Sequence, residues 1–462
     1  MKKYIELFKN IGLFAISNFA IKIVTFLLIP LYTYYLSTVE YGITDMLSTV
    51  VYLLIPILTI SLSDATLRFC IEDPSNKNTY ISIGFFVTIA SIFIVCLTLP
   101  LLDLSIFGGL GEYKAWFVLC YAVISLQLFF SNVARGINQV SLIVISSVIS
   151  SAVNIASACL FIAFFRAGIS GFFISLFLGN LTGVLVYLIK GKQYRFIKLS
   201  SCRNRSIIKT MCQYSLPLVP NALFWWITQS LNRFFISALL GISAVGFFAA
   251  ASRVPSIMRL VTGVFEQAWN LSAFQEAKSK DKNQFYTTIF RVYNSSLLMI
   301  TSLLIIFSYP ISTFLLKKSF ISAWVYIPIL LLSFYYSSVN SFFGSIYTAS
   351  LKTKFLFVTT FAGAAVCLLT NALLIPLFGL QGACVASCLS NFVVCLMRMF
   401  DSRRIVKISY NIFTVFLSQL FLILLIVVHL QVGNIFVDFF LMLGIFACVL
   451  YDCAHVFVFL KH

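Results

Sequence analysis

The sequence predicts an all-α protein that crosses a membrane many times. Of its 462 residues, 61% are hydrophobic and only 10% are charged, and its mean hydropathy is +1.01. A soluble domain must cover its surface with polar side chains, so this composition excludes one. Continuously apolar runs of about 20 residues recur along the chain, the length that a helix needs to cross a bilayer core. Strands of a membrane barrel would alternate in polarity instead, so we expect helices.

The apolar runs divide into fourteen expected spans, with twelve as the alternative count. Short connections separate some of them, such as Gly433 and Asn434 before the last run. The first run follows a basic start but is too long for a signal peptide, contains Lys22 and lacks a small-x-small cleavage site, so we expect it to be retained. The expected spans are 11–36, 42–66, 81–103, 115–137, 140–165, 169–190, 211–240, 244–265, 286–316, 324–350, 355–378, 380–400, 410–431 and 434–458.

The basic residues indicate the orientation of these spans. Lys and Arg number 32 against 14 Asp and Glu, which gives a net charge of +18. With the N-terminus inside, most of them lie in or beside cytoplasmic connections, whereas outer connections hold few, such as Lys114 and Arg166. This is the positive-inside distribution, and it places both termini in the cytoplasm. The charge therefore reflects membrane topology, and we expect no nucleic-acid partner.

No metal, cofactor or catalytic centre is expected. The 12 cysteines are dispersed and form no CxxC pair, and Cys384 and Cys388 lie one helical turn apart without a histidine nearby. We interpret these cysteines as small packing residues. The 3 histidines, all near the C-terminus, are too separated in sequence for a metal site: His429, His455 and His462.

The longest polar connection divides the chain into parts. Residues 191–210 include six basic residues and no acid, and we interpret them as a basic cytoplasmic linker. Six expected spans precede it, forming an N-terminal lobe over residues 1–190. Six more follow it in a C-terminal lobe over residues 211–405, and an additional helix pair occupies residues 406–462.

The two lobes carry matching segments. YLSTVEYG, residues 35–42, corresponds to LLGISAVG, residues 239–246, at an offset of 204 residues, and the same offset relates Glu72 to Glu276. GISG followed by Asn180 corresponds to GLQG followed by Asn391 at an offset of 211. Because each lobe has an even number of spans, the two have the same orientation and form a parallel repeat. Such lobes are expected to enclose a central cavity, as in alternating-access transporters.

Four basic residues lie within the expected spans and away from the cytoplasmic connections. Lys22 and Arg253 lie near mid-depth, Arg259 lies nearer the cytoplasm and Arg233 lies in the outer part of its span. A cation at the bilayer centre costs about 2.5–3.5 kcal/mol, so each requires a compensating partner. Arg233 and Arg259 also fit a structural ion pair or an extended stem that reaches an interface. We expect these four side chains to line a wet cavity and bind a phosphate-bearing substrate.

Small residues share one helix face with Arg253. Gly246, Ala249, Ala250, Arg253 and Ser256 recur at steps of three and four residues. Such a stripe permits close helix contact or lines a cavity. Two prolines, Pro56 and Pro255, each remove a backbone hydrogen bond and permit a kink.

Three acidic residues are candidates for gating or ion coupling. They are Asp45 in the outer part of the second span and Asp64 and Glu266 at inner span ends. An Asp45 to Arg253 contact across the cavity is one hypothesis for a gate. Aromatic residues such as Trp226 and Tyr335 can stack on sugar rings, although 16% of the chain is aromatic and packing is the simpler explanation.

Several segments together resemble a known family. Asn18 and Lys22 in the first span, PLYTYYLSTVEYGITDMLS (30–48), the segment 221–254 and NALLIPLFGLQGACVAS (371–387) resemble polysaccharide biosynthesis flippases. These are the O-antigen repeat-unit exporters of the multidrug/oligosaccharidyl-lipid/polysaccharide (MOP) superfamily. The resemblance covers roughly residues 5–405.

The resemblance implies a fold, a substrate and a location. Two six-helix lobes would surround a central cavity and move an undecaprenyl-pyrophosphate-linked oligosaccharide from the cytoplasmic to the periplasmic leaflet of the bacterial inner membrane. Related flippases use cationic cavity residues, and Lys22 and Arg253 match that role by region. Membrane lipids, a polysaccharide polymerase and chain-length machinery are the implied partners in O-antigen and lipopolysaccharide biosynthesis.

Other functions fit the sequence less well. The chain lacks G-x-x-x-x-G-K-[ST], so it does not bind ATP by a P-loop. A membrane glycosyltransferase or polymerase needs sizeable outer loops, whereas the largest outer connection is 103–114. A multidrug or ion-coupled exporter of the same superfamily is the main alternative, and it would favour an acidic cavity.

Overall fold

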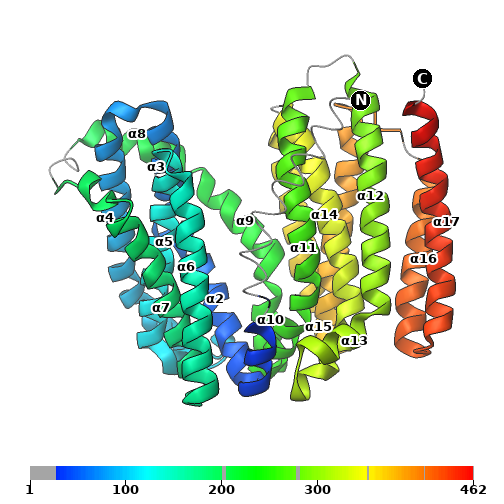
Figure 1. Cartoon of the computed structure of the whole chain (residues 1–462), viewed down its shortest axis with the longest axis horizontal. Coiled ribbons are helices and arrows are strands. Elements are labelled where there is room, and N and C mark those ends of the chain that lie inside the picture. The colour runs from blue at the N-terminus through cyan, green and yellow to red at the C-terminus, as the bar shows by residue number, and fades with distance from the viewer. Residues whose placement is uncertain are drawn as a thin grey trace. The chain divides into compact units, whose positions relative to one another are not determined.

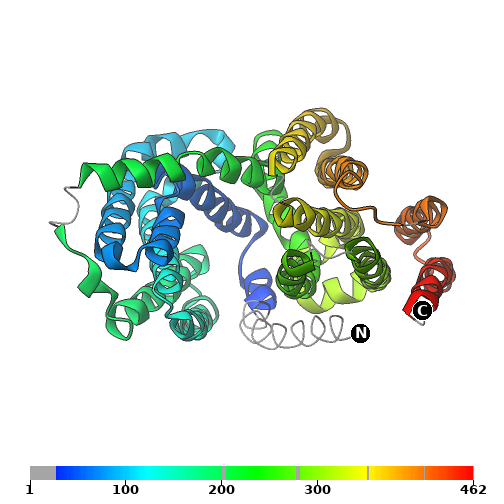
Figure 2. The ribbon, with the colours of Figure 1, turned by 90° about the horizontal axis from the view of Figure 1, so that it is seen from above.

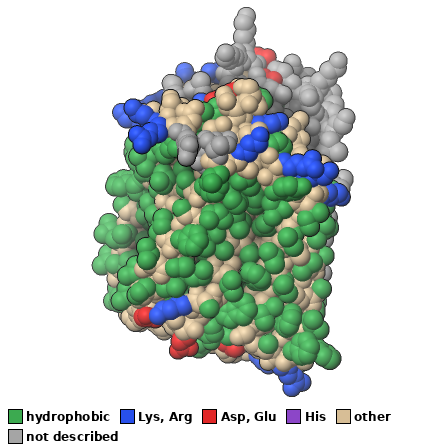
Figure 3. Space-filling view, turned by 90° about the vertical axis from the view of Figure 1, so that its left-hand side faces the viewer, with side chains coloured by type: hydrophobic (Ala, Val, Ile, Leu, Met, Phe, Trp, Pro, Cys, Tyr) green, Lys and Arg blue, Asp and Glu red, His purple; other side chains and the backbone are tan. Residues whose placement is uncertain are grey.

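Helices make up most of the described chain (Figure 1). The computed structural model describes residue 26 and residues 28–199, 204–276, 281–350, 353–409 and 411–460, and within these ranges it has no strand. Nine of the described helical segments are long and apolar enough to cross a membrane. Figure 3 shows a band of hydrophobic side chains bordered by charged ones, with Lys and Arg along the upper edge. The chain is therefore a multi-pass membrane protein, as its composition predicts.

The helices form two compact units that meet in sequence inside one helix. The N-terminal unit runs to Phe247, and the C-terminal unit runs from Phe248. The N-terminal unit contains α2 (Thr38–Leu58), α3 (Leu62–Glu72), α4 (Lys77–Thr98), α5 (Lys114–Gly136), α6 (Val140–Ala158), α7 (Gly168–Ile189), α8 (Arg205–Ser215), α9 (Leu218–Ser230) and α10 (Asn232–Leu240). The C-terminal unit contains most of α11 (Ile242–Glu276) and all of α12 (Lys282–Ile306), α13 (Ser308–Leu315), α14 (Ile327–Ala349), α15 (Thr353–Ser402), α16 (Ile412–Gln431) and α17 (Ile435–Leu460).

The expected spans correspond to helices, with several differences. Of the first span, 11–36, only residue 26 and residues 28–36 belong to the described part. The second, 42–66, ends as a helix at Leu58, and α3 begins at Leu62 after two residues with positive φ.

The seventh span, 211–240, is not one continuous helix: it breaks after Ser215, where Pro217 lacks a backbone donor, and again at Leu231 between α9 and α10. The eighth is longer than expected, because α11 extends over 35 residues. The ninth, 286–316, is divided at Phe307 between α12 and α13. The all-α prediction is confirmed, while individual helix ends differ.

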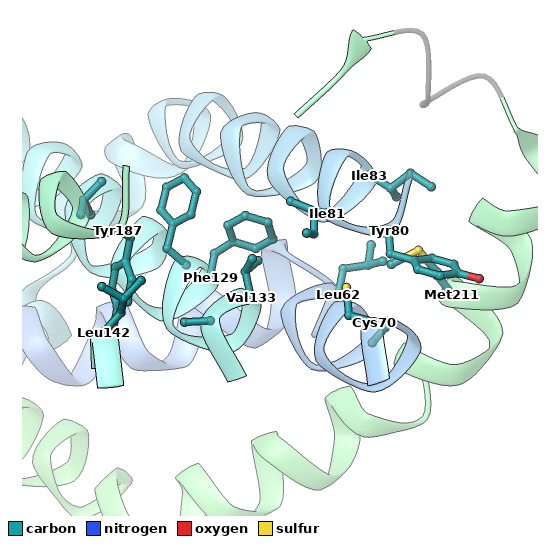
Figure 4. Packing of buried hydrophobic residues seen from close by; sticks show 14 residues of the cluster. Leu62, Cys70, Tyr80, Ile81, Ile83, Phe129, Val133, Leu142, Tyr187 and Met211 are labelled. Atoms are coloured by element: carbon teal, nitrogen blue, oxygen red, sulfur yellow. The ribbon is translucent and has the colours of Figure 1, made fainter. Parts of the chain in front are cut away.

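A cluster of buried side chains joins the helices of the N-terminal unit at one end (Figure 4). Leu62 of α3, Tyr80 of α4 and Phe129 of α5 belong to it, together with Tyr187 of α7. Met211 of α8 completes the cluster and is fully buried. Helix α8, although it follows the basic connection, therefore packs with the helices that precede it. The sequence-based division into lobes at 191–210 stays a prediction.

The predicted repeat is visible in the backbone. Gly168 and Gly379, the first glycines of GISG and GLQG, both adopt a left-handed conformation, with φ of 54° and 58°. Gly168 begins α7, and Gly379 marks the kink that divides α15 into two expected spans. Asn180 and Asn391 each donate from Nδ2 to the carbonyl four residues earlier, at 2.7 and 3.1 Å. Residues matched at an offset of 211 thus have the same local geometry, as expected of repeated segments.

A second repeat-related pair lies in direct contact. A Cβ on Gly42 would lie 2.2 Å from the Ile242 carbonyl oxygen, and a Cβ on Gly246 would lie 2.0 Å from the Thr38 carbonyl oxygen. The offset of 204 residues relates both glycines and both carbonyls, so the contact is reciprocal. The hydroxyls of Thr38 and Ser243 add a hydrogen bond of 2.8 Å. We call this the glycine contact. It confirms that the small-residue stripe of α11 permits close approach at Gly246.

Candidate functional site

Asp45 and Arg233 form an ion pair inside the N-terminal unit. Arg233 Nε lies 2.5 Å from Asp45 Oδ2, and both side chains are largely buried, at 17% and 9% exposure. Arg233 Nη1 also donates to the Gln229 carbonyl oxygen at 3.1 Å. Of the alternatives for Arg233, the structure shows the ion pair, and the hypothetical contact of Asp45 with Arg253 stays a prediction.

Trp226 links α9 to α2 by a hydrogen bond. Its indole Nε1 donates to the Thr49 carbonyl oxygen at 3.0 Å, one turn beyond Asp45 on α2. The ring also packs edge-on against Phe234, with centroids 5.5 Å apart, and Phe234 packs in turn against Phe107. Trp226 is thus engaged in packing around the Asp45 ion pair, which was the simpler of the two explanations for the aromatic residues.

Glu40 caps two helices, a role that the sequence analysis missed. Ser37 and Glu40 form a capping box at the start of α2, with Glu40 Oε2 accepting from Ser37 N at 2.8 Å. Glu40 Oε1 also accepts from Ile169 N at 3.3 Å, at the start of α7. A Cβ on Gly168 would lie 2.9 Å from this oxygen, so the glycine gives the carboxylate access. The Ser-x-x-Glu spacing inside YLSTVEYG is the signal that identifies the box.

The α11 stripe carries Arg253 and Arg259. Ala249 and Ala250 are buried, Arg253 is half-buried and Arg259 is exposed. The guanidinium carbon of Arg259 lies 4.9 Å from the ring centroid of Phe334 on α14, a cation–π contact. Helix α11 continues through Pro255, whereas α2 ends two residues after Pro56.

Two further predicted site residues are described, Asp64 on α3 and Glu266 on α11. Lys22 is outside the described residues. Asp64 lies at the start of α3, where its carboxylate accepts from Asn132 Nδ2 at 3.2 Å. Glu266 is half-buried on α11, beside the stacked rings of Phe265 and Tyr293.

A groove of about 450 Å³ lies in the C-terminal unit between α12, α14, α15 and α16. Its walls are mainly apolar, and Arg403, just after α15, lies at the end that the sequence analysis places toward the cytoplasm. The sequence analysis singled out Tyr335 but not the groove, because the packing of α16 on α14 is not encoded in local sequence. The apolar lining includes Phe290, Leu332, Leu389, Phe392, Phe416 and Leu420.

A chain of hydrogen bonds crosses the groove wall. Tyr336 donates to Gln419 Oε1 at 3.0 Å, and Gln419 Nε2 donates to the Tyr335 hydroxyl at 3.0 Å. Tyr335 donates in turn to Asn294 Oδ1 at 2.6 Å. These four residues satisfy one another, so polar side chains line an apolar groove without leaving these donors unpaired.

Solved structures with the same fold are transporters. An inward-facing multidrug resistance MATE family transporter of the MOP superfamily has a TM-score of 0.70 and 15% identity, covering 86% of this chain and 100% of its own. The lipid II flippase MurJ, in an inward closed conformation, has a TM-score of 0.70 and 15% identity, covering 97% of this chain and 100% of its own. A MOP superfamily transporter from Pyrococcus furiosus has a TM-score of 0.60 and 14% identity, covering 86% of this chain and 96% of its own. These likenesses show a MOP transporter fold.

No curated protein matches the sequence. The family model of the polysaccharide biosynthesis proteins, in contrast, matches residues 7–269, more than half of the chain. The match includes the glycine contact, the Asp45 ion pair and Arg253. The chain belongs to the polysaccharide biosynthesis protein family.

Proposed function

We propose that the chain is a flippase that moves an undecaprenyl-pyrophosphate-linked oligosaccharide, an O-antigen or related repeat unit, to the periplasmic leaflet. The observation that carries this proposal is the combination of a polysaccharide biosynthesis family match with the MOP transporter fold. A transporter rather than an enzyme fits both. In the bacterial inner membrane with both termini inside, alternating access would carry the head group between leaflets. A polymerase and chain-length machinery would then receive it.

Cationic residues are the proposed head-group site. Lys22 and Arg253 are the primary candidates, and Arg259 lies within two turns of Arg253 on α11. Arginine can bind phosphate oxygens with two parallel donors, which favours a diphosphate over a neutral sugar. In this structure the guanidinium of Arg233 is paired with Asp45. Arg233 would have to leave Asp45 before it could bind the substrate.

The groove is the proposed site for the lipid chain. Its apolar walls match a polyprenyl chain. Asp45, Asp64 and Glu266 remain the candidates for ion coupling or gating.

A multidrug exporter is the second candidate function, favoured by the MATE transporter fold. Cationic drugs require acidic residues in the binding cavity. The basic character of Lys22, Arg253 and Arg259 favours an anionic substrate instead.

Genetic complementation tests the proposal. We expect deletion of the gene to accumulate lipid-linked glycan in the cytoplasmic leaflet and wild-type complementation to clear it. Lys22→Ala and Arg253→Ala should fail to complement, while Lys209→Ala, at an exposed basic residue on α8, should complement fully. Normal export by both site variants would reject the head-group assignment. Export of glycan in the deletion strain, with loss of drug resistance instead, would favour the exporter.

A further inference from the structure

Three buried polar side chains form a chain at one end of the C-terminal unit. Ser308 Oγ lies 3.0 Å from His429 Nε2, and His429 Nδ1 lies 2.6 Å from Asp438 Oδ2. Their exposed fractions are 0%, 7% and 1%. Ser308 begins α13, His429 lies near the end of α16 and Asp438 lies near the start of α17. We call these three residues the clasp.

The clasp does not have the access that a hydrolase requires. Its order of serine, histidine and aspartate resembles a nucleophile with its base and orienting acid. Ser308 has no exposed surface, however, so no substrate reaches its hydroxyl. The edge of the Trp324 ring, in the 3₁₀ segment η8 (Lys318–Tyr326), packs against the His429 ring, with centroids 5.8 Å apart. The arrangement fixes the imidazole rather than exposing it.

The position of the clasp indicates what it holds. Helices α16 and α17 form a hairpin at the edge of the C-terminal unit, drawn in orange and red in Figure 2, and both pack on α12. Gly433, with φ of 61°, makes the tight turn between them. The clasp lies beside this turn and joins both helices to α13. The hairpin is therefore tied to the rest of its unit at its closed end.

The opposite half of α16 forms a wall of the groove. Ile412, Phe416 and Leu420 line it, and Gln419 bonds across it to Tyr335. Gln419 precedes His429 by about 15 Å along the helix, given a rise of about 1.5 Å per residue. One helix thus has a buried anchor at one end and a groove-lining face at the other.

We expect the clasp to hold α16 more strongly than the hydrogen bonds of Gln419 do. The bonds of Gln419 join neutral groups, and such bonds contribute little between membrane helices. The His429 to Asp438 contact joins two titratable groups within apolar surroundings. Asp438 Oδ1 is buried without a hydrogen-bond partner among the described residues, so the carboxyl group depends on His429. Loss of His429 would remove the hydrogen bond to Oδ2 of Asp438, and the buried carboxyl group would then lose its recorded partner.

We propose that the clasp is a positioning element that holds the α16–α17 hairpin so that α16 forms a wall of the groove. The inference rests on the proposed function, in which the groove binds a lipid chain. The inference gives a role to α16 and α17, the helix pair that is additional to the two expected six-helix lobes. His429 and Asp438 act through α16, and neither contacts the lipid.

Photolabelling of the full-length protein in nanodiscs tests the proposal. The probe is a photoreactive undecaprenyl phosphate, and mass spectrometry measures adducts on peptides covering 412–423. His429→Leu and Asp438→Asn should each lower labelling at least about fivefold, the low end of ordinary coupling between sites. Asp103→Asn, which removes a carboxylate from the exposed ion pair with Lys114, should leave labelling unchanged. The swap of His429→Asp with Asp438→His should restore it, because the pair re-forms and Ser308 can donate to the carboxylate.

Hydrogen exchange of the same samples without probe separates the two proposals. Residues 412–423 should exchange faster in both single variants and normally in the swap, while α5 exchanges normally in all of them. If exchange behaves this way but the wild-type protein is not labelled, the lipid groove is wrong and the anchoring of α16 stands. If labelling and exchange in both single variants match the wild type, the positioning role of the clasp is wrong. Equal acceleration throughout the protein would also reject it, because the clasp would then support the whole fold.

Discussion

At the scale of single residues, the Asp45 ion pair has the largest expected effect on stability. Asp45 and Arg233 lie on α2 and α10, 188 residues apart in sequence, and both are largely buried. Removing one partner from a buried pair leaves the other charge without compensation. The partner of Arg233 was not predictable from sequence, because the two helices that carry the pair meet only in the folded chain.

Substitution of Asp45 tests this pair. Asp45→Asn should lower the free energy of unfolding by about 3–5 kcal/mol, the usual cost of breaking a buried pair. Thermal unfolding in detergent measures the change. The swap of Asp45→Arg with Arg233→Asp should recover part of the loss. A swap that is as unstable as the two single losses together would show that the charges do not stabilise each other.

Asp73, in the turn between α3 and α4, makes the stability of the fold depend on pH in the acid range. Hydrogen bonds from the side chains of Ser75, Asn76 and Tyr80, in decreasing order of effect, lower its pKa from the usual 3.8 to about 2. Because the folded pKa lies below the unfolded one, the carboxylate stabilises the fold above about pH 4. That contribution is lost as pH falls from about 4 toward 2.

The expected result is a pH-dependent difference between two proteins. At neutral pH the wild type should melt at a higher temperature than Asp73→Asn. The reason is that the negatively charged Asp73 carboxylate accepts three side-chain hydrogen bonds. The gap in melting temperature should close as the pH is lowered from about 4 toward 2. A gap that stays constant over this range would mean that the charge of Asp73 contributes nothing to the turn.

At the scale of helices, one carboxylate serves two helix starts. Glu40 completes the capping box with Ser37 on α2 and accepts from the backbone of α7. Glu40→Ala should therefore destabilise the protein more than Ser37→Ala, which should cost about 1 kcal/mol for loss of one cap.

Glu40→Gln is the matched control, because glutamine also completes a capping box. Its melting temperature should lie between those of the wild type and Glu40→Ala. If Glu40→Ala and Ser37→Ala are equally stable, the bond to Ile169 adds nothing to the cap.

The spans themselves were predictable, because an apolar run of the right length must become a helix in a bilayer. What local composition does not encode is how one helix meets another. Gln419 on α16 meets Tyr335 on α14 across 84 residues of sequence, so the groove appears only once both helices are in place. Within the described residues, hydropathy thus identified the elements, and tertiary packing determined the candidate lipid site. The cationic head-group site stays a prediction, since Lys22 lies outside the described residues.

At the scale of the whole molecule, the repeat was predictable because its matched positions require glycine, either for a positive φ or for lack of room for a side chain. Gly168 and Gly379 keep left-handed backbones that other residues rarely adopt, so the motif remains readable after the surrounding side chains have diverged. Gly42 and Gly246 were recognisable for a related reason: neither position has room for a side chain.

Substitution of these glycines tests the reciprocal contact. Gly246→Ala should destabilise the protein by about 1–3 kcal/mol, because the new Cβ would lie 2.0 Å from the Thr38 carbonyl oxygen and the helices must separate. Gly263→Ala on the same helix is the control, since its Cβ would meet nothing within 4 Å. That variant should be neutral or slightly stabilised, because alanine favours helix. Equal melting temperatures for the two variants would contradict the tight fit at Gly246.

The glycine contact also determines what is lost when its two helices part. It is made of backbone atoms and one pair of hydroxyls, and each helix keeps its own ladder of hydrogen bonds when the other withdraws. A methyl group added at either glycine would therefore be enough to hold the two helices apart.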